Sequence, residues 1–361
     1  MEVFVNKLEY VDEPFRVPLQ EWLSIQYVID DSDLHVSRYN NIVLQPDGNW
    51  TESSGGGGKY VYIGNMMSIW GHCITDNLKK LWFLKTPDYL KLRENGYIIC
   101  CTIKGGVLPE NLKKLLQLLD VNVADILIVN SQLTAAELVV PEDCIVVKNG
   151  KRYYYPQYKT MIDAVCSKIP INEALPNRIY LSRTKLKGDK IEYGEQQIET
   201  VFKELGFTIV YPELLSFEEQ MQLYRNCKVM ASTEGSIAHN CLFAKDGLKQ
   251  IIIRKSVLIN SYQFMMMSMK NVDVTYIDAH LTIFKIFASW SGPFFMYLSG
   301  NFSKWANDNG IAIQSRFNKT EFLKYTIVCC WQFIRYRRKP RMIPEPFISF
   351  YLNTLKRLIL G

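Results

Sequence analysis

The feature that most constrains the fold is a regular alternation of short apolar segments and amphipathic segments in the second half of the chain. The apolar segments favour strands, and the segments between them repeat their apolar positions with helical spacing. Strands separated by helices of about ten residues predict a parallel sheet covered on both faces, that is, a doubly wound sheet. The predicted strands are 178–182, 207–211, 228–232, 250–255 and 272–277, and the predicted helices are 195–206, 216–227 and 236–244.

The first half shows a similar but less regular alternation, which indicates a second α/β unit. With 361 residues, 48% of them hydrophobic, the chain is long enough to bury two cores. We predict α/β domains at residues 1–157 and 158–290 and a helical tail at 291–361. In the first domain the predicted elements are helix 68–85, strand 97–103, helix 109–119 and strands 124–129 and 137–147, with a helix-like connector at 159–169.

Residues 231–247, ASTEGSIAHNCLFAKDG, form a junction between a predicted strand and a predicted helix. Wound sheets bind ligands beyond the carboxyl ends of their strands. Gly235 would allow close approach of the backbone, and the free amides of the helix that starts at Ser236 favour a phosphate or diphosphate. His239 would still lie in the first helical turn, within reach of a phosphate or a ribose hydroxyl. The same residues could instead form only a cap and a tight turn.

The junction belongs to a longer pattern of short motifs. The motif residues are Tyr180-Leu181-Ser182-Arg183, Gly206-Phe207, Pro212-Glu213, Ser216-Phe217, Glu219-Gln220, Gly235, Asn240 and Leu242-Phe243. With these motifs, residues 178–254 resemble the core of the family 61 glycosyltransferases, long labelled domain of unknown function 563. The segment 62–82, YIGNMMSIWGHCITDNLKKLW, is similar to the family's His-x-x-x-Asp helix more loosely. The chain departs at Lys190, Gly194 and Glu234, where the family often has Arg, Asn and His.

The resemblance implies a GT-B-like α/β architecture, with two facing, doubly wound, Rossmann-like domains and C-terminal helices. It implies an inverting transfer that uses a nucleotide-sugar as substrate and needs no cofactor and no obligatory metal. The domain at 158–290 would then hold the donor, and the domain at 1–157 would lie on the acceptor side. The bacterial branch of the family builds capsule, exopolysaccharide or lipopolysaccharide, so the implied acceptor is an oligosaccharide or a lipid-linked saccharide.

Cations and amide donors would have to stabilise the leaving diphosphate if no metal takes part. Arginine's planar fork suits phosphate better than a lysine ammonium, so Arg183 is the first candidate. A diphosphate would repel Glu234, so a functional Glu234 should contact the ribose or the sugar hydroxyls. Lys187 lies in the same loop as Lys185. The predicted donor-binding residues are Arg178, Arg183, Lys185, Glu234, Gly235, Ser236, His239 and Asn240.

An inverting transfer also needs a base that takes the proton from the acceptor hydroxyl. His72 and Asp76 are four residues apart in WGHCITD, so they would share one face of a helix. The carboxylate of Asp76 could orient the imidazole of His72 or could itself be the base. This pair is the predicted catalytic centre. Alternatively, His72 could be a buried polar residue held by its neighbour.

Other signals exclude several classes of protein. The nine cysteines lack metal-knuckle spacing, which indicates reduced thiols in a cytoplasmic chain, and nothing marks the amino terminus for secretion. The segment SGGGGKY is not a phosphate-binding P-loop, because Ser53 and Tyr60 occupy positions that the motif reserves for other residues. Asp31 and Asp33 have the Asp-x-Asp spacing of metal-dependent transferases and form the alternative catalytic hypothesis.

The tail is strongly basic. From Arg316 onward it holds ten Lys or Arg and two acidic residues, mixed with aromatic and aliphatic stretches. This composition suits an anionic membrane surface. We therefore predict that residues 316–361 bind the inner face of the plasma membrane and make the protein peripheral there. The tail could also pack on the N-terminal domain. No nucleic-acid-binding module accompanies it.

A hypothesis of another class is a catalytically inactive, membrane-associated scaffold or glycan-binding protein that has kept the fold. Its support is Glu234, which stands where the family often has a histidine. It would turn over no nucleotide-sugar, and Arg183→Ala would then affect little beyond stability.

Overall fold

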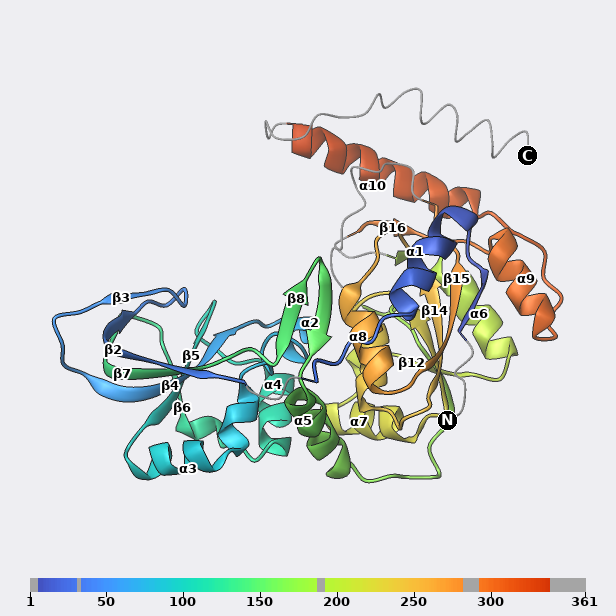
Figure 1. Cartoon of the computed structure of the whole chain (residues 1–361). Helices are drawn as coiled ribbons and strands as arrows, with labels where there is room; N and C mark the ends of the chain where they lie inside the picture. The colour runs from blue at the N-terminus through green and yellow to red at the C-terminus, as the bar shows by residue number, and fades with distance from the viewer. Residues whose placement is uncertain (1–5, 31–33, 187–191, 282–291, 338–361) are drawn as a thin grey trace. The chain divides into compact units, whose positions relative to one another are not determined.

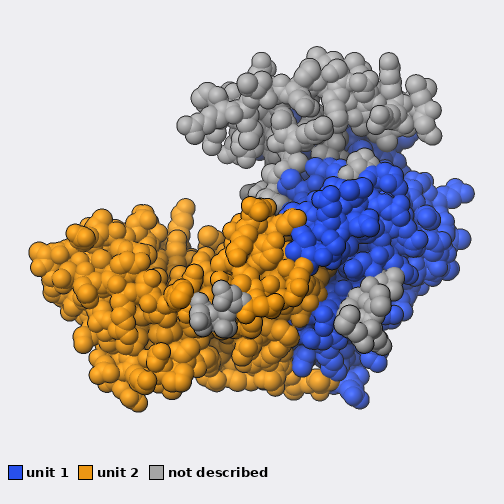
Figure 2. Space-filling view, viewed as in Figure 1, with its two compact units in different colours: residues 1–25, 172–260, 270–361 blue, residues 26–171, 261–269 orange. Residues whose placement is uncertain are grey.

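A computed structural model describes residues 6–30, 34–186, 192–281 and 292–337. Two compact units are coloured separately in Figure 2. Unit 1 comprises residues 1–25, 172–260 and 270–361, and unit 2 comprises residues 26–171 and 261–269. Residues 1–25, assigned above to the first domain, therefore cluster with the second half of the chain. The hypothetical metal ligands Asp31 and Asp33, the loop residues Lys187 and Lys190, and residues 338–361 of the tail lie outside the described residues.

Unit 1 is built on a six-stranded sheet in which each neighbouring pair of strands is parallel (Figure 1). This confirms the α/β class and the five strands predicted from the alternation, while the edge strand β1 comes from the amino terminus. The strands, in sheet order, are β1 (Lys7–Tyr10), β15 (Asp273–Asp278), β14 (Lys249–Arg254), β13 (Val229–Thr233), β10 (Arg178–Leu181) and β12 (Thr208–Val210).

In the core of unit 1, aromatic side chains from two helices pack against residues of this sheet. The ring of Phe202 stacks on that of Tyr180 in β10, with centroids 4.6 Å apart, and Trp305 lies 5.2 Å from Phe202. Burying a side chain of this size contributes about 2 kcal/mol or more to the free energy of unfolding. This packing therefore stabilises β10, the strand that precedes Arg183. The helices of unit 1 are α1 (Glu13–Leu23), α6 (Glu195–Glu204), η3 (Pro212–Leu214), α7 (Phe217–Asn226), η4 (Ala238–Phe243), α9 (Gly300–Asp308) and α10 (Lys319–Arg337).

The Ser-Phe-x-Glu part of the motif has a structural role at the start of α7. The hydroxyl of Ser216 accepts a hydrogen bond from the Glu219 amide at 3.3 Å, and the Glu219 carboxylate accepts one from the Ser216 amide at 2.8 Å. This reciprocal capping box satisfies two backbone donors that the first turn of a helix leaves free. Ser216 and Glu219 therefore define where α7 begins.

Unit 2 contains a mixed sheet, which agrees with the α/β unit expected for the first half but is not parallel throughout. Strands β7, β4, β5 and β6 are parallel, but β2 pairs antiparallel with both β3 and β7. The turn at residues 45–49 returns the chain directly into the neighbouring strand, which makes that pair antiparallel. The order is β3 (Trp50–Glu52), β2 (Val36–Leu44), β7 (Leu133–Pro141), β4 (Gly58–Met66), β5 (Ile98–Ile103) and β6 (Ile126–Ile128).

Two helical segments of unit 2 differ from expectation. The continuous helix predicted over 68–85 is wrong. The single helical turn α2 ends at Cys73, non-helical turns follow, and a 3₁₀ helix begins only at Leu81. Helix α8 (Ser261–Met269) lies between β14 and β15 in the sequence but belongs to unit 2. The remaining elements are α2 (Trp70–Cys73), η1 (Leu81–Lys85), α3 (Pro87–Glu94), α4 (Glu110–Leu118), η2 (Val123–Asp125), β8 (Ile145–Lys148), β9 (Lys151–Tyr154) and α5 (Pro156–Ser167).

The described part of the tail packs on unit 1. Phe322, Tyr325 and Cys329 of α10 form one buried cluster with Tyr193 and Phe295, which belong to the short parallel strands β11 (Glu192–Tyr193) and β16 (Phe294–Phe295). The cluster ties α10 to the segment that carries Glu192.

We expect Gly194→Ala to lower the free energy of unfolding by about 3 kcal/mol or more. Gly194 has a φ of 84°, and an added Cβ would lie 1.9 Å from the carbonyl oxygen of Met296. Gly206→Ala is the matched control, because Gly206 has a φ of 78° and no atom lies within 4 Å of its added Cβ. The Gly206→Ala variant should lower the free energy of unfolding by only about 1 kcal/mol. Denaturant unfolding of both variants measures the difference, and equal losses would contradict the steric argument.

Candidate active site

The order of strands in unit 1 places the predicted donor residues at a topological switch point. The chain runs from β10 outward to β12 and then returns to β13 on the other side of β10. Ligands of open α/β sheets bind where the strand order reverses in this way, outside the carboxyl ends of the two strands. Leu181 pairs with Ser232, so the segments that follow both strands begin side by side. The topology thus brings Arg183 together with Glu234, Gly235 and Ser236.

A buried carboxylate holds two cations at this switch point. Glu192 Oε1 lies 2.5 Å from Lys255 Nζ and 3.5 Å from Arg183 Nε, and its Oε2 accepts a hydrogen bond from Thr233 Oγ1 at 2.8 Å. Burial alone would raise the pKa of Glu192, but the charges of Lys255 and Arg183 outweigh it and hold the pKa below its ordinary value. Glu192 is therefore an ionised anchor for both side chains.

Sequence reasoning missed both Glu192 and Lys255. Lys255 directly follows Arg254, the last residue of β14, which is the strand beside β13. The predicted strand 250–255 included Lys255, whereas β14 ends one residue earlier. Glu192 had no local signal, because its strand of two residues is too short to recognise.

The turn after β13 runs beside the Lys255 ammonium. Gly235 has a φ of 119°, and a Cβ placed on it would lie 3.5 Å from Lys255 Nζ. Glycine adopts this backbone conformation without the strain that other residues incur. Gly235 and Ser236 are half-buried, so the turn is less enclosed than the strand before it.

Glu234 is a buried carboxyl group with an unsatisfied oxygen. Its side chain is 6% exposed, and Oε2 makes no hydrogen bond within the described residues. Burial raises the pKa of Glu234 to about 7, although the positive charges of Arg254 and Lys255 act in the opposite direction. A substantial fraction of the carboxyl is therefore neutral near pH 7.

The α-helix expected over 236–244 is wrong, because the structure has the six-residue 3₁₀ helix η4 instead. His239 and Asn240 lie in it and are both 3% exposed, and His239 Nε2 lies 3.1 Å from the side-chain nitrogen Nδ2 of Asn260. The short helix lacks the aligned first turn on which the predicted anion site depended. The candidate anion contact is instead the turn at Gly235 and Ser236.

Two of the predicted cations do not lie with Arg183. Arg178 begins β10, so it lies at the opposite edge of the sheet, where its guanidinium covers the Phe207 ring at 4.6 Å. Lys185 is exposed in the turn after Arg183, with its ammonium 5.8 Å from the Tyr211 ring. Glu195, from α6, accepts a hydrogen bond from the Arg183 amide at 3.0 Å and so fixes the backbone there.

A separate group of candidate residues lies in unit 2, after β4. From β4 the chain proceeds to β5 and β6 on one side, while β7 lies on the other side, so a switch point again falls beside this strand. The segment after β4 carries His72 in the single turn of α2. Although α2 ends at Cys73, the backbone still turns tightly enough to keep His72 and Asp76 in contact.

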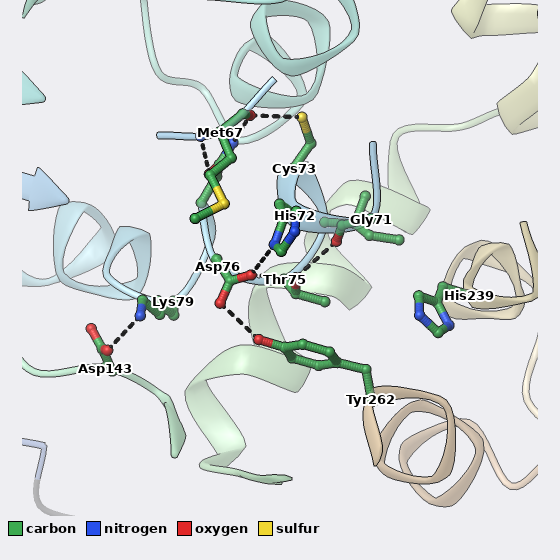
Figure 3. Close-up of polar contacts among 12 residues, drawn as sticks. Met67, Gly71, His72, Cys73, Thr75, Asp76, Lys79, Asp143, His239 and Tyr262 are labelled. Carbon is green, nitrogen blue, oxygen red and sulfur yellow. Dashed lines mark hydrogen bonds and ion pairs between the residues drawn. The ribbon is translucent and has the colours of Figure 1, made fainter. Parts of the chain in front are cut away.

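His72, Asp76 and Tyr262 form a hydrogen-bonded network (Figure 3). His72 Nδ1 lies 2.5 Å from Asp76 Oδ2, and the Tyr262 hydroxyl donates to Asp76 Oδ1 at 2.7 Å. The guanidinium of Arg152 lies 4.0 Å from the centre of the Tyr262 ring. Sequence reasoning missed Tyr262, which is 186 residues away from Asp76 in the chain.

The network leaves the second imidazole nitrogen available. Burial alone would raise the pKa of Asp76. The hydrogen bonds from His72 and Tyr262 lower the pKa by more than burial raises it, so the carboxylate is ionised. An ionised carboxylate only accepts hydrogen bonds, which places a proton on Nδ1 and, in the neutral ring, a lone pair on Nε2. The His72 side chain is 41% exposed, and Nε2 has no partner among the described residues. This is the geometry of a general base.

Comparison with protein families gives a match over residues 70–252 to the family described as Glycosyltransferase 61. The matched range is about half of the chain, and it contains His72, Asp76, Arg183 and Gly235. Lys255 lies just outside it. No curated protein matches the chain significantly.

We expect Glu234→Gln to stabilise the protein above pH 7 relative to wild type. Because the folded-state pKa of about 7 exceeds the ordinary 4.5, the folded protein binds this proton more tightly, and wild type loses stability as the pH rises from about 4.5 to 7. Glutamine stays neutral, so the variant should gain about 2 to 3 kcal/mol relative to wild type between pH 4.5 and pH 8.

Thermal unfolding across this pH range measures the difference. Glu219→Gln is the control of opposite sign, because hydrogen bonds from Ser216 lower the pKa of Glu219. That variant should lose stability relative to wild type as the pH rises through the ordinary carboxyl range. A Glu234→Gln difference that stays constant with pH would contradict the assignment.

Proposed function

The chain belongs to glycosyltransferase family 61, and on this premise we propose that it is an inverting, nucleotide-sugar-dependent glycosyltransferase of GT-B architecture. The sugar would pass from the nucleotide to a hydroxyl of an oligosaccharide or lipid-linked saccharide. The observation that carries this proposal is the network of His72, Asp76 and Tyr262. It leaves Nε2 of an exposed imidazole able to take the acceptor's proton, as a single-displacement transfer requires.

On the donor side, Arg183 and the turn at Gly235 and Ser236 support binding of a diphosphate. Both follow strands that border the switch point of unit 1. Guanidinium and amide donors at such a position can stabilise the charge that develops on the leaving diphosphate. We therefore propose that the transfer requires no metal and no other cofactor.

A specific observation also supports the scaffold alternative. Glu234 stands where family members often have a histidine, and its carboxyl is buried beside the turn that would meet the donor. A protein that had lost donor binding could accept such a change. Turnover of a nucleotide-sugar distinguishes the two proposals directly.

The acceptor class and the location of the enzyme are proposed from the tail. Among the described residues, no helix is both long and apolar enough to cross a membrane. On α10, Leu323, Ile327 and Trp331 recur every four residues and are 59%, 60% and 57% exposed. An exposed apolar stripe on a basic helix suits an anionic membrane surface. We propose that α10 binds the inner face of the plasma membrane, where lipid-linked intermediates of bacterial surface polysaccharides would be found.

We expect His72→Ala to lower kcat by a factor of about 10² to 10⁴ and to leave the KM for the donor nearly unchanged, because a general base acts in the chemical step. The assay measures nucleotide release from a panel of nucleotide-sugars, with mixed oligosaccharides as acceptors, with and without EDTA. His35→Ala is the matched control, since His35 is an exposed histidine of the same unit. Equal activity of the two variants would exclude His72 as the base, and loss of activity in EDTA would exclude the metal-independent mechanism.

We expect Ile327→Glu to reduce binding to vesicles of phosphatidylcholine and phosphatidylserine by at least about tenfold, because it places a charge within the apolar stripe. Thr200→Glu adds the same charge at an exposed position of α6 in the same unit, away from the stripe, and should have a smaller effect. Co-sedimentation with anionic and with neutral vesicles measures binding. Equal binding of wild type and Ile327→Glu would exclude the apolar stripe as the membrane-binding surface.

A further inference from the structure

We propose that Lys255 and Arg183 together bind the diphosphate of the donor, and that Glu192 is the positioning residue that sets both cations. This inference rests on the proposed function and adds to it the residues that receive the leaving group. Lys255 is not among the residues selected by the family motifs, and it follows the matched range.

The first support is the convergence of three neighbouring parallel strands. Strands β10, β13 and β14 end at the same edge of the sheet, and the residues that follow them include Arg183, Gly235 and Lys255. The register pairs Thr233 with Ile253, so the turn after β13 and the residue after β14 begin at the same level. The distance of 3.5 Å between Lys255 Nζ and a Cβ placed on Gly235 shows how close the ammonium lies to this turn.

The second support is the number of donors that Glu192 leaves unused. An ammonium has three N–H donors and a guanidinium has five. Among the described residues, the Lys255 ammonium donates one hydrogen bond, to Glu192, and it also lies 4.5 Å from the centre of the Phe294 ring. Arg183 meets Glu192 through Nε, and its two Nη atoms make no hydrogen bond to any described residue. Nη1 and Nη2 form the end of the fork that binds phosphate oxygens in pairs.

The third support comes from the carboxyl groups around these cations. The side chain of Glu234 interacts electrostatically with Arg254, Lys255 and Asp278. Asp278 and Arg254 pair with each other at 3.1 Å, and Glu192 balances one of the two remaining cations. Glu195 also faces this group, and burial together with the charge of Glu192 raises its pKa to about 8. With Glu234 and Glu195 both neutral, one positive charge therefore remains for the ligand, and ionisation of Glu234 cancels it. Diphosphate affinity should accordingly fall as the pH rises through about 7, where burial has placed the pKa of Glu234.

A buried ion pair could instead serve stability alone, and buried pairs often add little to it. The two roles differ in what a variant loses. A structural pair would change the unfolding temperature and affect all nucleotides equally. A diphosphate site would lose the preference for a nucleoside diphosphate over the corresponding monophosphate.

The test is calorimetric titration of the full chain with UDP, GDP, CDP, ADP and dTDP, and then with the monophosphate of the tightest ligand. Lys255→Met should weaken the diphosphate at least tenfold and the monophosphate much less, and Lys255→Arg should restore most of the loss. Glu192→Gln should alter the same preference, because it removes the charge that anchors both cations. Lys249→Met is the matched control, because Lys249 is exposed at the opposite end of the same strand, and it should bind like wild type.

The pH profile supplies an independent readout. Wild-type affinity for the diphosphate should fall between pH 6 and pH 8 more steeply than that of Glu234→Gln. If Lys255→Met does not fold, this comparison and the Lys255→Arg variant carry the test. Unchanged diphosphate preference in a folded Lys255→Met or Glu192→Gln variant would overturn the inference and leave the proposed function standing. Failure of all five diphosphates to bind wild type would instead remove the donor proposal, and the inference with it.

Discussion

Parallel pairing of β10 with both β12 and β13 is the constraint on which the candidate donor site depends. Each parallel connection must return the chain to the opposite edge before the next strand begins, so every strand of the sheet ends at one edge. The reversal of direction after β12 separates the crossovers on either side of β10 and leaves room between the segments that follow β10 and β13. The positions of Arg183 and Gly235 follow from this pairing, and the parallel pairing of β13 with β14 adds Lys255.

The elements that the sequence predicted well are those whose signal is local. Strands β10, β12, β13, β14 and β15 are short apolar runs between amphipathic helices, and each lies where the alternation placed it. Strand β1 could not be recognised as part of this sheet, because its partner β15 lies more than 260 residues away. Residues 68–85 and 236–244 contain apolar positions with helical spacing, yet packing replaces much of each segment with turns and 3₁₀ helix.

The same distinction applies to the candidate site. Arg183, Glu234 and Gly235 follow recognisable strands, and the spacing of His72 and Asp76 indicated their contact directly. Arg178 was grouped with Arg183 because both flank one strand, but the two ends of a strand lie at opposite edges of a sheet. Tyr262 and Glu192 reach their partners through tertiary contacts that no spacing rule encodes. Lys255 was missed because the predicted strand 250–255 included it, whereas β14 ends at Arg254.

The placement of α8 in unit 2 has a consequence for synthesis on the ribosome. Unit 2 lacks its final helix, and with it the hydroxyl of Tyr262, until residue 269 has left the exit tunnel. Unit 1 begins with residues 1–25 but also waits for its later strands. Neither unit can therefore be completed during translation of the first 260 residues, although domains generally fold one after another as they emerge. Long incomplete intermediates of both units therefore precede the emergence of the last strands and of α8.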